Sequence, residues 1–240
     1  MSADIIRLGS VESTMHHAAA LAAEGCVHGT AVVAESQTAG IGRHGHVWHS
    51  EPGSGLYVSL VLRLPLTPSE MPVLTLALGL AAGEAIGLAT GLACDLRWPN
   101  DILTGGKKVA GILVQIVDGA AIAGIGVNVN HAAFPEWIAS EATSIRLATG
   151  HEADRENLLR QLLQSVEETC NVLLSSGRPA ILKLFANASS FALGKRVRVD
   201  LGGGKNIEGI TAGLTDQGFL RVRKQDGTVE TVIAGGVRPA

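Results

Sequence analysis

Residues suited to anion binding are concentrated in a glycine-rich, histidine-rich loop at residues 37–54. The run Gly40-Ile41-Gly42-Arg43-His44-Gly45 combines three glycines with one arginine. Backbone N–H groups and a guanidinium can therefore come close to a negatively charged group. The run matches GxGxxG, but residues 46–53 have helix breakers and no helical period, so a dinucleotide-binding turn is excluded.

The same loop holds His44, His46 and His49. Imidazole is a common transition-metal ligand, yet no cysteine or aspartate lies nearby to complete a zinc site. We favour hydrogen-bond donors beside an anion. Metal binding, or a solvated loop with incidental histidines, are the alternatives.

A second candidate cluster follows an apolar run at residues 94–98. Arg97-Trp98-Pro99-Asn100-Asp101 places an amide and a carboxylate at a predicted strand end, where polar groups are held rigidly. Lys108 begins the next apolar strand, so we expect its ammonium near the mouth of that strand. A surface lysine flanking a strand is the alternative.

The elements that position these loops are of mixed type. Ser13 or Thr14 caps a helix that Gly25 ends, and a longer helix begins at Asp154 and is ended by Gly177 and Pro179. Short apolar runs predict strands at 30–36, 57–64, 94–98, 109–117 and 121–129, with an Asp118-Gly119 hairpin, and a small all-β unit is expected beyond Phe191.

The segment from Val73 to Cys94 is nearly free of charge and approaches the length of a membrane span. We favour a buried helix lying on a sheet, because glycines and alanines dilute its larger apolar residues. Gly79, Gly83, Gly87 and Gly91 recur every fourth residue, which predicts a helical face that lies very close to a neighbour.

Composition sets the broad class. The chain has 240 residues, of which 46% are hydrophobic and 17% charged, with a net charge of −3. This is enough for one large core plus a small appendage, and it does not suit coating of nucleic acid or an anionic membrane. Three widely spaced cysteines fit reduced thiols, and the N-terminus lacks an export signal, so we expect a cytoplasmic location.

Taken together, the motifs resemble the biotin protein ligase family. The resemblance covers nearly the whole chain in the family's order, and no DNA-binding domain precedes Ser13, so single-function ligases are the more similar type. It is carried by Ser13-Thr14, ESQTAGIGRHGHVW at 35–48, RWPND at 97–101, KKVAGIL at 107–113 and GVNVN at 126–130.

The resemblance implies an α+β fold. Its first part, residues 1–190, would be a class II synthetase-like catalytic domain with a mixed β-sheet and flanking helices. Residues 191–240 would form a small SH3-like β-barrel.

The implied reaction has two steps. Biotin and ATP with Mg²⁺ give biotinyl-5′-AMP and pyrophosphate, and biotin then passes to a lysine of a biotin carboxyl carrier protein. Neither a tightly bound metal nor DNA or a membrane is expected, and an exposed strand could pair two copies into a homodimer. A lipoate or octanoate ligase or transferase of the same fold, and a non-catalytic acyl-adenylate-binding module, are the alternatives.

The resemblance also implies site residues. Lys108 and Arg43 would neutralise carboxylate and phosphate, and Asp101 would position Mg²⁺ or the incoming lysine. We expect the positive charges of Lys108 and Arg43 to converge on one cavity. The residues implied for biotin are Ser13, Thr14, Met15, Gln37, Gly40, Ile41, Gly42, Arg43, Lys108 and Gly111. Those implied for the nucleotide are Arg43, His44, His46, Trp48, Trp98, Asn100, Lys108 and Asn128.

Four of these positions depart from the family's usual residues. Met15 replaces an asparagine, and Ile41, His44 and His46 stand in a loop that usually reads GRGRRGR. Loss of a close charged contact costs about 1.5 to 3 kcal/mol, so weaker or altered binding is expected.

Overall fold

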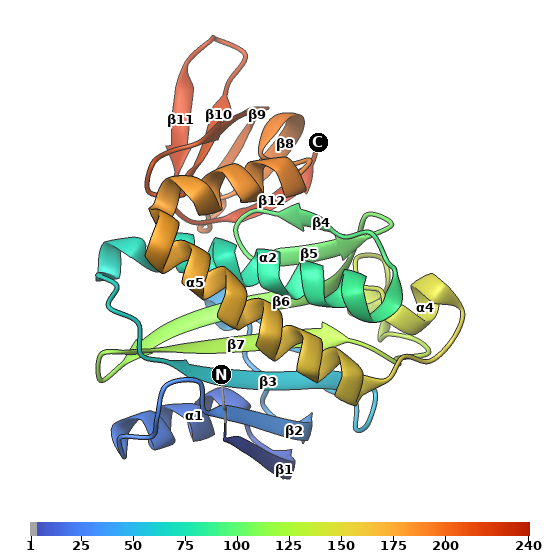
Figure 1. The fold of residues 1–240 in the computed structure, drawn as a ribbon. Helices are drawn as coiled ribbons and strands as arrows, with labels where there is room; N and C mark the ends of the chain where they lie inside the picture. The colour runs from blue at the N-terminus through green and yellow to red at the C-terminus, as the bar shows by residue number, and fades with distance from the viewer. Residues whose placement is uncertain (1–3) are drawn as a thin grey trace.

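The computed structural model describes residues 4–240, apart from the side chains of His44 and Pro68. Two sheets share the chain, and the second sits beside one edge of the first (Figure 1). A mixed sheet with flanking helices is thereby confirmed.

The larger sheet has seven strands in the order β1-β2-β3-β7-β6-β5-β4. β1 runs parallel to β2 and every other pair is antiparallel. The predicted hairpin is confirmed, because Val117 pairs with Ala120 across Asp118 and Gly119, which both have positive φ. The strand β1, which the sequence analysis did not predict, lies at the free edge. The strands are β1 (Ile5–Val11), β2 (Ala31–Gln37), β3 (Gly55–Leu62), β4 (Asp95–Arg97), β5 (Asp101–Thr104), β6 (Lys107–Val117) and β7 (Ala120–Asn128).

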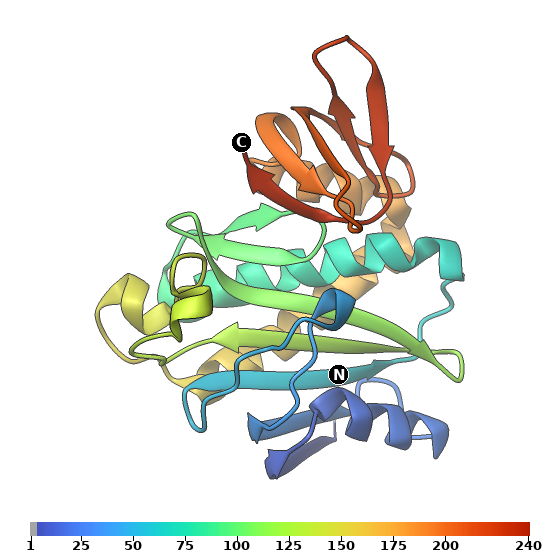
Figure 2. The same ribbon diagram turned by 180° about the vertical axis from the view of Figure 1, so that it is seen from behind.

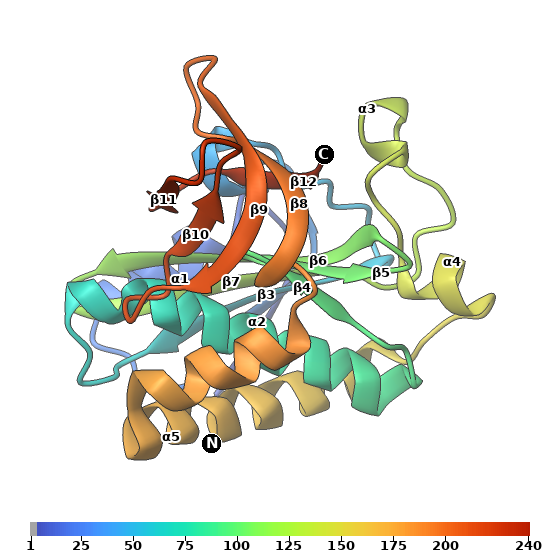
Figure 3. The ribbon, with the colours of Figure 1, turned by 90° about the horizontal axis from the view of Figure 1, so that it is seen from above.

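Two helices, α2 (Met71–Thr90) and α5 (Arg155–Ala188), form a layer on one face of this sheet (Figure 3). The predicted end of the first helical segment at Gly177 is confirmed, but α5 continues beyond it, which the sequence analysis did not predict. Gly177 bends the chain with φ 73° and ψ −178°, and helix resumes to Ala188. Glycine adopts this angle without strain, and Pro179 lies in the first turn of the new segment, where its missing N–H breaks no bond.

The glycines of α2 do not create the close approach that their spacing predicted. A Cβ atom on Gly79 would meet no atom within 4 Å, and one on Gly83 would make ordinary contacts at 3.5 Å with Leu96. Gly91 instead ends the helix with φ 75°. Within residues 4–240, α2 alone has the length and composition of a membrane span, but 56% of its most apolar window is buried inside the protein. A core helix is the better description.

The opposite face carries only α1 (Thr14–Ala23) at one end, which leaves β6 and β7 open to the glycine-rich loop (Figure 2). The side chain of Ser13 caps α1 by accepting from the backbone N–H of Met15. The remaining short turns lie in loops: η1 (Arg43–Gly45), η2 (Pro68–Glu70), α3 (Glu136–Ala139) and α4 (Ile145–Thr149).

The second sheet is antiparallel, with the order β11-β10-β9-β8-β12. Its outer strands do not pair with each other, so the expected barrel is not closed by hydrogen bonds within the described residues. Trp98 Nε1 joins it to the larger sheet by donating to the carbonyl oxygen of Gly218 at 2.9 Å. The strands are β8 (Leu193–Asp200), β9 (Asn206–Leu214), β10 (Leu220–Arg223), β11 (Val229–Val232) and β12 (Gly236–Pro239).

Candidate active site

The glycine-rich loop folds back on itself over the open face of the sheet (Figure 2). Ile41 bridges Val47, and the N–H of Trp48 donates to the Gly40 carbonyl at 2.9 Å. A Cβ on Gly40 would lie 2.7 Å from the Trp48 carbonyl oxygen, so this fold of the loop requires glycine there. The loop thereby places Trp48 over β6 and β7, and Arg43 beside Asn100 and Gly235.

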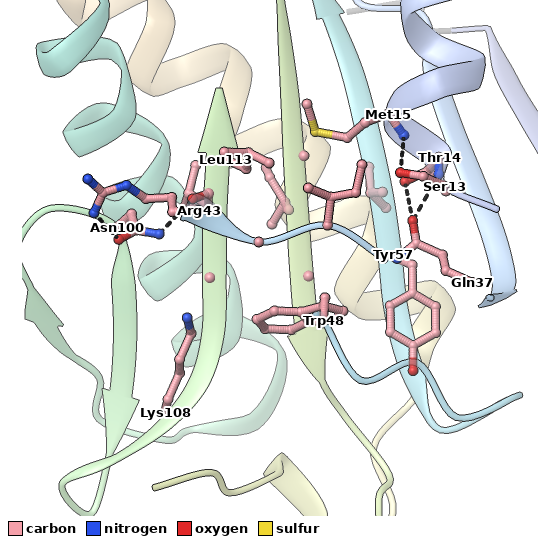
Figure 4. A pocket seen from close by; sticks show the side chains of 18 residues that line it. Ser13, Thr14, Met15, Gln37, Arg43, Trp48, Tyr57, Asn100, Lys108 and Leu113 are labelled. Carbon is pink, nitrogen blue, oxygen red and sulfur yellow. Dashed lines mark hydrogen bonds between the residues drawn. The ribbon is translucent and has the colours of Figure 1, made fainter. Parts of the chain in front are cut away.

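A small cavity of about 50 Å³ lies beneath the loop. Its polar end is a network in which Thr14 Oγ1 lies 3.0 Å from Gln37 Oε1 and 2.8 Å from Ser59 Oγ. Figure 4 shows this end on one side of the cavity and Lys108 and Arg43 on the other. Nine of the ten residues predicted for biotin line it, all except Gly40: Ser13, Thr14, Met15, Gln37, Ile41, Gly42, Arg43, Lys108 and Gly111.

Trp48 closes the cavity between these two ends. Its indole lies on two glycines, since a Cβ on Gly126 would be 2.5 Å from Trp48 Cε2 and one on Gly111 would be 3.0 Å from Cζ3. Indole Nε1 is buried without a hydrogen-bond partner. Met15 closes the cavity from another side, because a Cβ on Gly124 would clash with its sulfur. In β7, Gly124 thus makes room for the side chain of Met15 and Gly126 for that of Trp48, and both side chains line the cavity.

Lys108 forms an ion triad with Asp101 and Arg97. Lys108 Nζ lies 2.5 Å from Asp101 Oδ1, and two nitrogens of Arg97 donate to Oδ2 at 2.8 and 3.2 Å. Burial favours a raised pKa for Asp101, but Lys108 and Arg97 outweigh it and hold the pKa below its usual value. Lys108 Nζ also lies 5.2 Å from the centre of the Trp48 ring, a cation–π contact.

The triad does not fit a Mg²⁺ ion held by Asp101. Each oxygen of its carboxylate already accepts from a cation, so a metal there would displace Lys108 or Arg97. The neighbouring acidic side chain in the cleft, Glu141, is paired with Arg238 at 2.8 Å. We therefore assign no metal to these residues.

Arg43 reaches the same region from the loop. Its Nη1 donates to Asn100 Oδ1 at 3.2 Å and to the Gly235 carbonyl at 3.3 Å. Burial lowers the pKa of the guanidinium, and the nearby Asp101 charge partly opposes this; the side chain stays protonated at neutral pH. Figure 4 shows the guanidinium turned toward Asn100. Lys108 and Arg43 both line the small cavity, and each cation is held by a different partner, Asp101 and Asn100.

A larger cleft of about 570 Å³ opens on the other side of Lys108 and Arg43. Its size is typical of a small-molecule site. Residues predicted for the nucleotide line it: Arg43, His46, Trp48, Trp98, Asn100, Lys108 and Asn128. Asp101 lines it too, while the side chain of His44 lies outside the described residues.

Some predicted nucleotide residues are also bound within the protein. Trp98 is 2% exposed and donates to Gly218, as described above. Asn128 Nδ2 donates to the Thr143 carbonyl at 3.0 Å, so its amide braces the segment beside Lys108.

Several cleft residues were missed. Phe134, Trp137 and Glu141 come from loops without a motif, and the second sheet adds residues 200–202 and 235–238. The sequence around Trp137 has no motif that indicates a binding residue. In the structure, Trp137 is notable as a large apolar side chain that is 63% exposed.

The two loop histidines whose side chains the structure describes, His46 and His49, do not share a cluster. His46 is exposed in the cleft, whereas a ligating atom of His49 lies within 4.8 Å of His131 and Glu51. Burial lowers the pKa of His131 to about 4, although the Glu51 charge opposes this. The ring is therefore neutral at neutral pH.

Comparisons with known proteins agree with this geometry. Residues 10–131 match the biotin/lipoate A/B protein ligase family, and residues 192–237 match the biotin protein ligase C terminal domain. The chain is 35% identical over 234 residues to the bifunctional ligase/repressor BirA of Bacillus spizizenii, covering 95% of this chain and 71% of that one. It is 33% identical over 222 residues to the biotin acetyl-CoA-carboxylase ligase of Mycobacterium tuberculosis, covering 90% and 80%.

The fold agrees as well. The biotin protein ligase from Aquifex aeolicus, solved in complex with biotin and ATP, superposes with a TM-score of 0.87 at 30% identity and covers 99% of both chains. The chain therefore belongs to the biotin/lipoate A/B protein ligase family, and within it to the biotin protein ligases.

Proposed function

We propose that this protein activates biotin with ATP to biotinyl-5′-AMP and transfers the biotinyl group to a lysine of a biotin carboxyl carrier protein. One observation carries the proposal. The small cavity with a polar end and the nucleotide-sized cleft share Lys108 and Arg43 as common walls. A carboxylate in the first site and an α-phosphate in the second would meet at these cations.

The chemistry needs positive charge at that junction. Biotin carboxylate and α-phosphate repel each other, and Lys108 and Arg43 would stabilise the charge that develops as they join. In this conformation Asp101 holds Lys108 and Asn100 holds Arg43. Substrates would compete for these cations, so Asp101 and Asn100 are proposed to keep them in place before binding. Mg²⁺ would then be held mainly by the ATP phosphates rather than by Asp101.

Biotin suits the small cavity better than lipoate or octanoate. The cavity end opposite Lys108 carries Ser13, Thr14 and Gln37, whose hydroxyl and amide groups can pair with a ureido ring. An alkyl or dithiolane tail offers no hydrogen bonds there, and a site built for polar groups rejects such a ligand. Trp48 and Met15 both line this cavity, so a bound biotin would contact them.

Pyrophosphate release with biotin, lipoate and octanoate tests the proposal. We expect pyrophosphate release with biotin but not with lipoate or octanoate. The release should be lost in Lys108→Ala and Arg43→Ala. Lys107→Ala is the matched control, because Lys107 is the exposed neighbour whose ammonium contacts the Ala139 carbonyl. Ligand binding without pyrophosphate release would instead support a non-catalytic binding module.

The acceptor protein, a homodimer and a cytoplasmic location remain predictions. The free edge of β1 offers a strand for pairing two copies.

A further inference from the structure

We propose that His49, Glu51 and His131 form a Zn²⁺ site at the end of the glycine-rich loop. One ligating atom from each of the three side chains lies within 4.8 Å of the others. Two imidazoles and one carboxylate are a ligand set that zinc uses, with a fourth position left for water. His49 also lines the large cleft proposed for the nucleotide, so the site lies at the edge of that cleft.

His131 is the fixed ligand. It is 0% exposed, its ring stacks on Phe134 with centroids 5.1 Å apart, and its backbone carbonyl accepts from Ser144 Oγ at 2.7 Å. His131 Nδ1 is buried and has no hydrogen-bond partner. A buried polar atom without a partner costs about 1 to 3 kcal/mol, which points to a missing ligand.

Tyr57 decides which nitrogen of His131 is free. The Tyr57 hydroxyl donates its proton to the Glu51 carbonyl at 3.0 Å, and its oxygen lies 3.4 Å from His131 Nε2. A hydroxyl has one proton, so toward the ring it can only accept, and Nε2 then carries the hydrogen. The lone pair is left on Nδ1, and the Tyr57 contact orients the ring as hydrogen-bonded neighbours of zinc ligands do.

The other two ligands can close on a metal. Tetrahedral zinc with bonds of about 2.0 to 2.1 Å sets its ligand atoms roughly 3.3 Å apart, so the cluster must contract. His49 is half-buried and Glu51 is exposed, so rotation of their side chains can supply this. The backbones are already joined, since the N–H groups of Val129 and Asn130 both donate to the Ser54 carbonyl. Bound zinc would anchor the loop one residue beyond Trp48.

Titration of the metal-free full chain with Zn²⁺ tests this, followed by calorimetry and by the visible spectrum of the Co²⁺-substituted protein. We expect one ion per chain, a tetrahedral Co²⁺ spectrum and a higher melting temperature with metal. His49→Ala and Glu51→Gln change accessible side chains, and each should weaken zinc binding by about 100-fold or more, beyond what losing a ligand's hydrogen-bonding neighbour costs.

His46→Ala is the matched control, because it removes an exposed histidine of the same loop. It should leave zinc affinity unchanged. Zinc binding that persists in His49→Ala and Glu51→Gln, or that His46→Ala abolishes, would overturn the proposal, as would the absence of binding to the unmodified chain.

Discussion

The ion triad predicts that Lys108 matters mainly for catalysis and Asp101 mainly for stability. Lys108→Ala removes a side chain that is 28% exposed and leaves Asp101 with both hydrogen bonds from Arg97. We expect it to lower the free energy of unfolding by about 1 kcal/mol or less, the range of accessible ion pairs. Removing a charge aimed at the reacting centre should slow pyrophosphate release about 100- to 1,000-fold.

Asp101→Asn should lower the free energy of unfolding much more than Lys108→Ala does. The side chains of Asp101 and Arg97 are only 14% and 7% exposed, so the change leaves a buried guanidinium without its counterion. Breaking a buried pair costs about 3 to 5 kcal/mol, and water that reaches Lys108 moderates this to roughly 3 kcal/mol. Urea unfolding followed by circular dichroism measures both variants.

The same triad sets a pH dependence. The pKa of Asp101 is depressed in the folded protein, so its contribution to stability is present above the unfolded value of about 3.9. That contribution is lost as the pH falls through the folded value, and Asp101→Asn should flatten this acid limb. If Lys108→Ala unfolds as readily as Asp101→Asn, or releases pyrophosphate normally, our assignment of roles is refuted.

Three further changes test the binding geometry. Gly126→Ala should displace the indole of Trp48, because the added methyl group costs about 1 to 3 kcal/mol in a packed site. Calorimetry should then show weaker biotin binding. Thr14→Val removes a hydroxyl from the polar end, so biotin affinity should fall while any octanoate affinity stays constant; an equal fall in both would contradict the ureido assignment. Trp98→Phe leaves the Gly218 carbonyl unpaired, and urea unfolding should show a loss of about 1 to 3 kcal/mol.

Local signals in the sequence determined most elements and the family. The helix cap at Ser13, the Asp118-Gly119 turn and the apolar runs of β6 and β7 depend on neighbouring residues, so the sequence reveals them. Lys108, Arg43 and the biotin and nucleotide residues followed from motifs that occur in the family's order.

Contacts between distant segments required the tertiary structure. The sequence marked the stop at Gly177 but not the second helical segment of α5 that follows it, because packing of that segment decides whether it forms. Nor does spacing reveal that His49 faces His131, 82 positions away, rather than His46 in its own loop. The seating of Trp48 on Gly111 and Gly126 is likewise set by strand register, which joins residues that the sequence keeps apart.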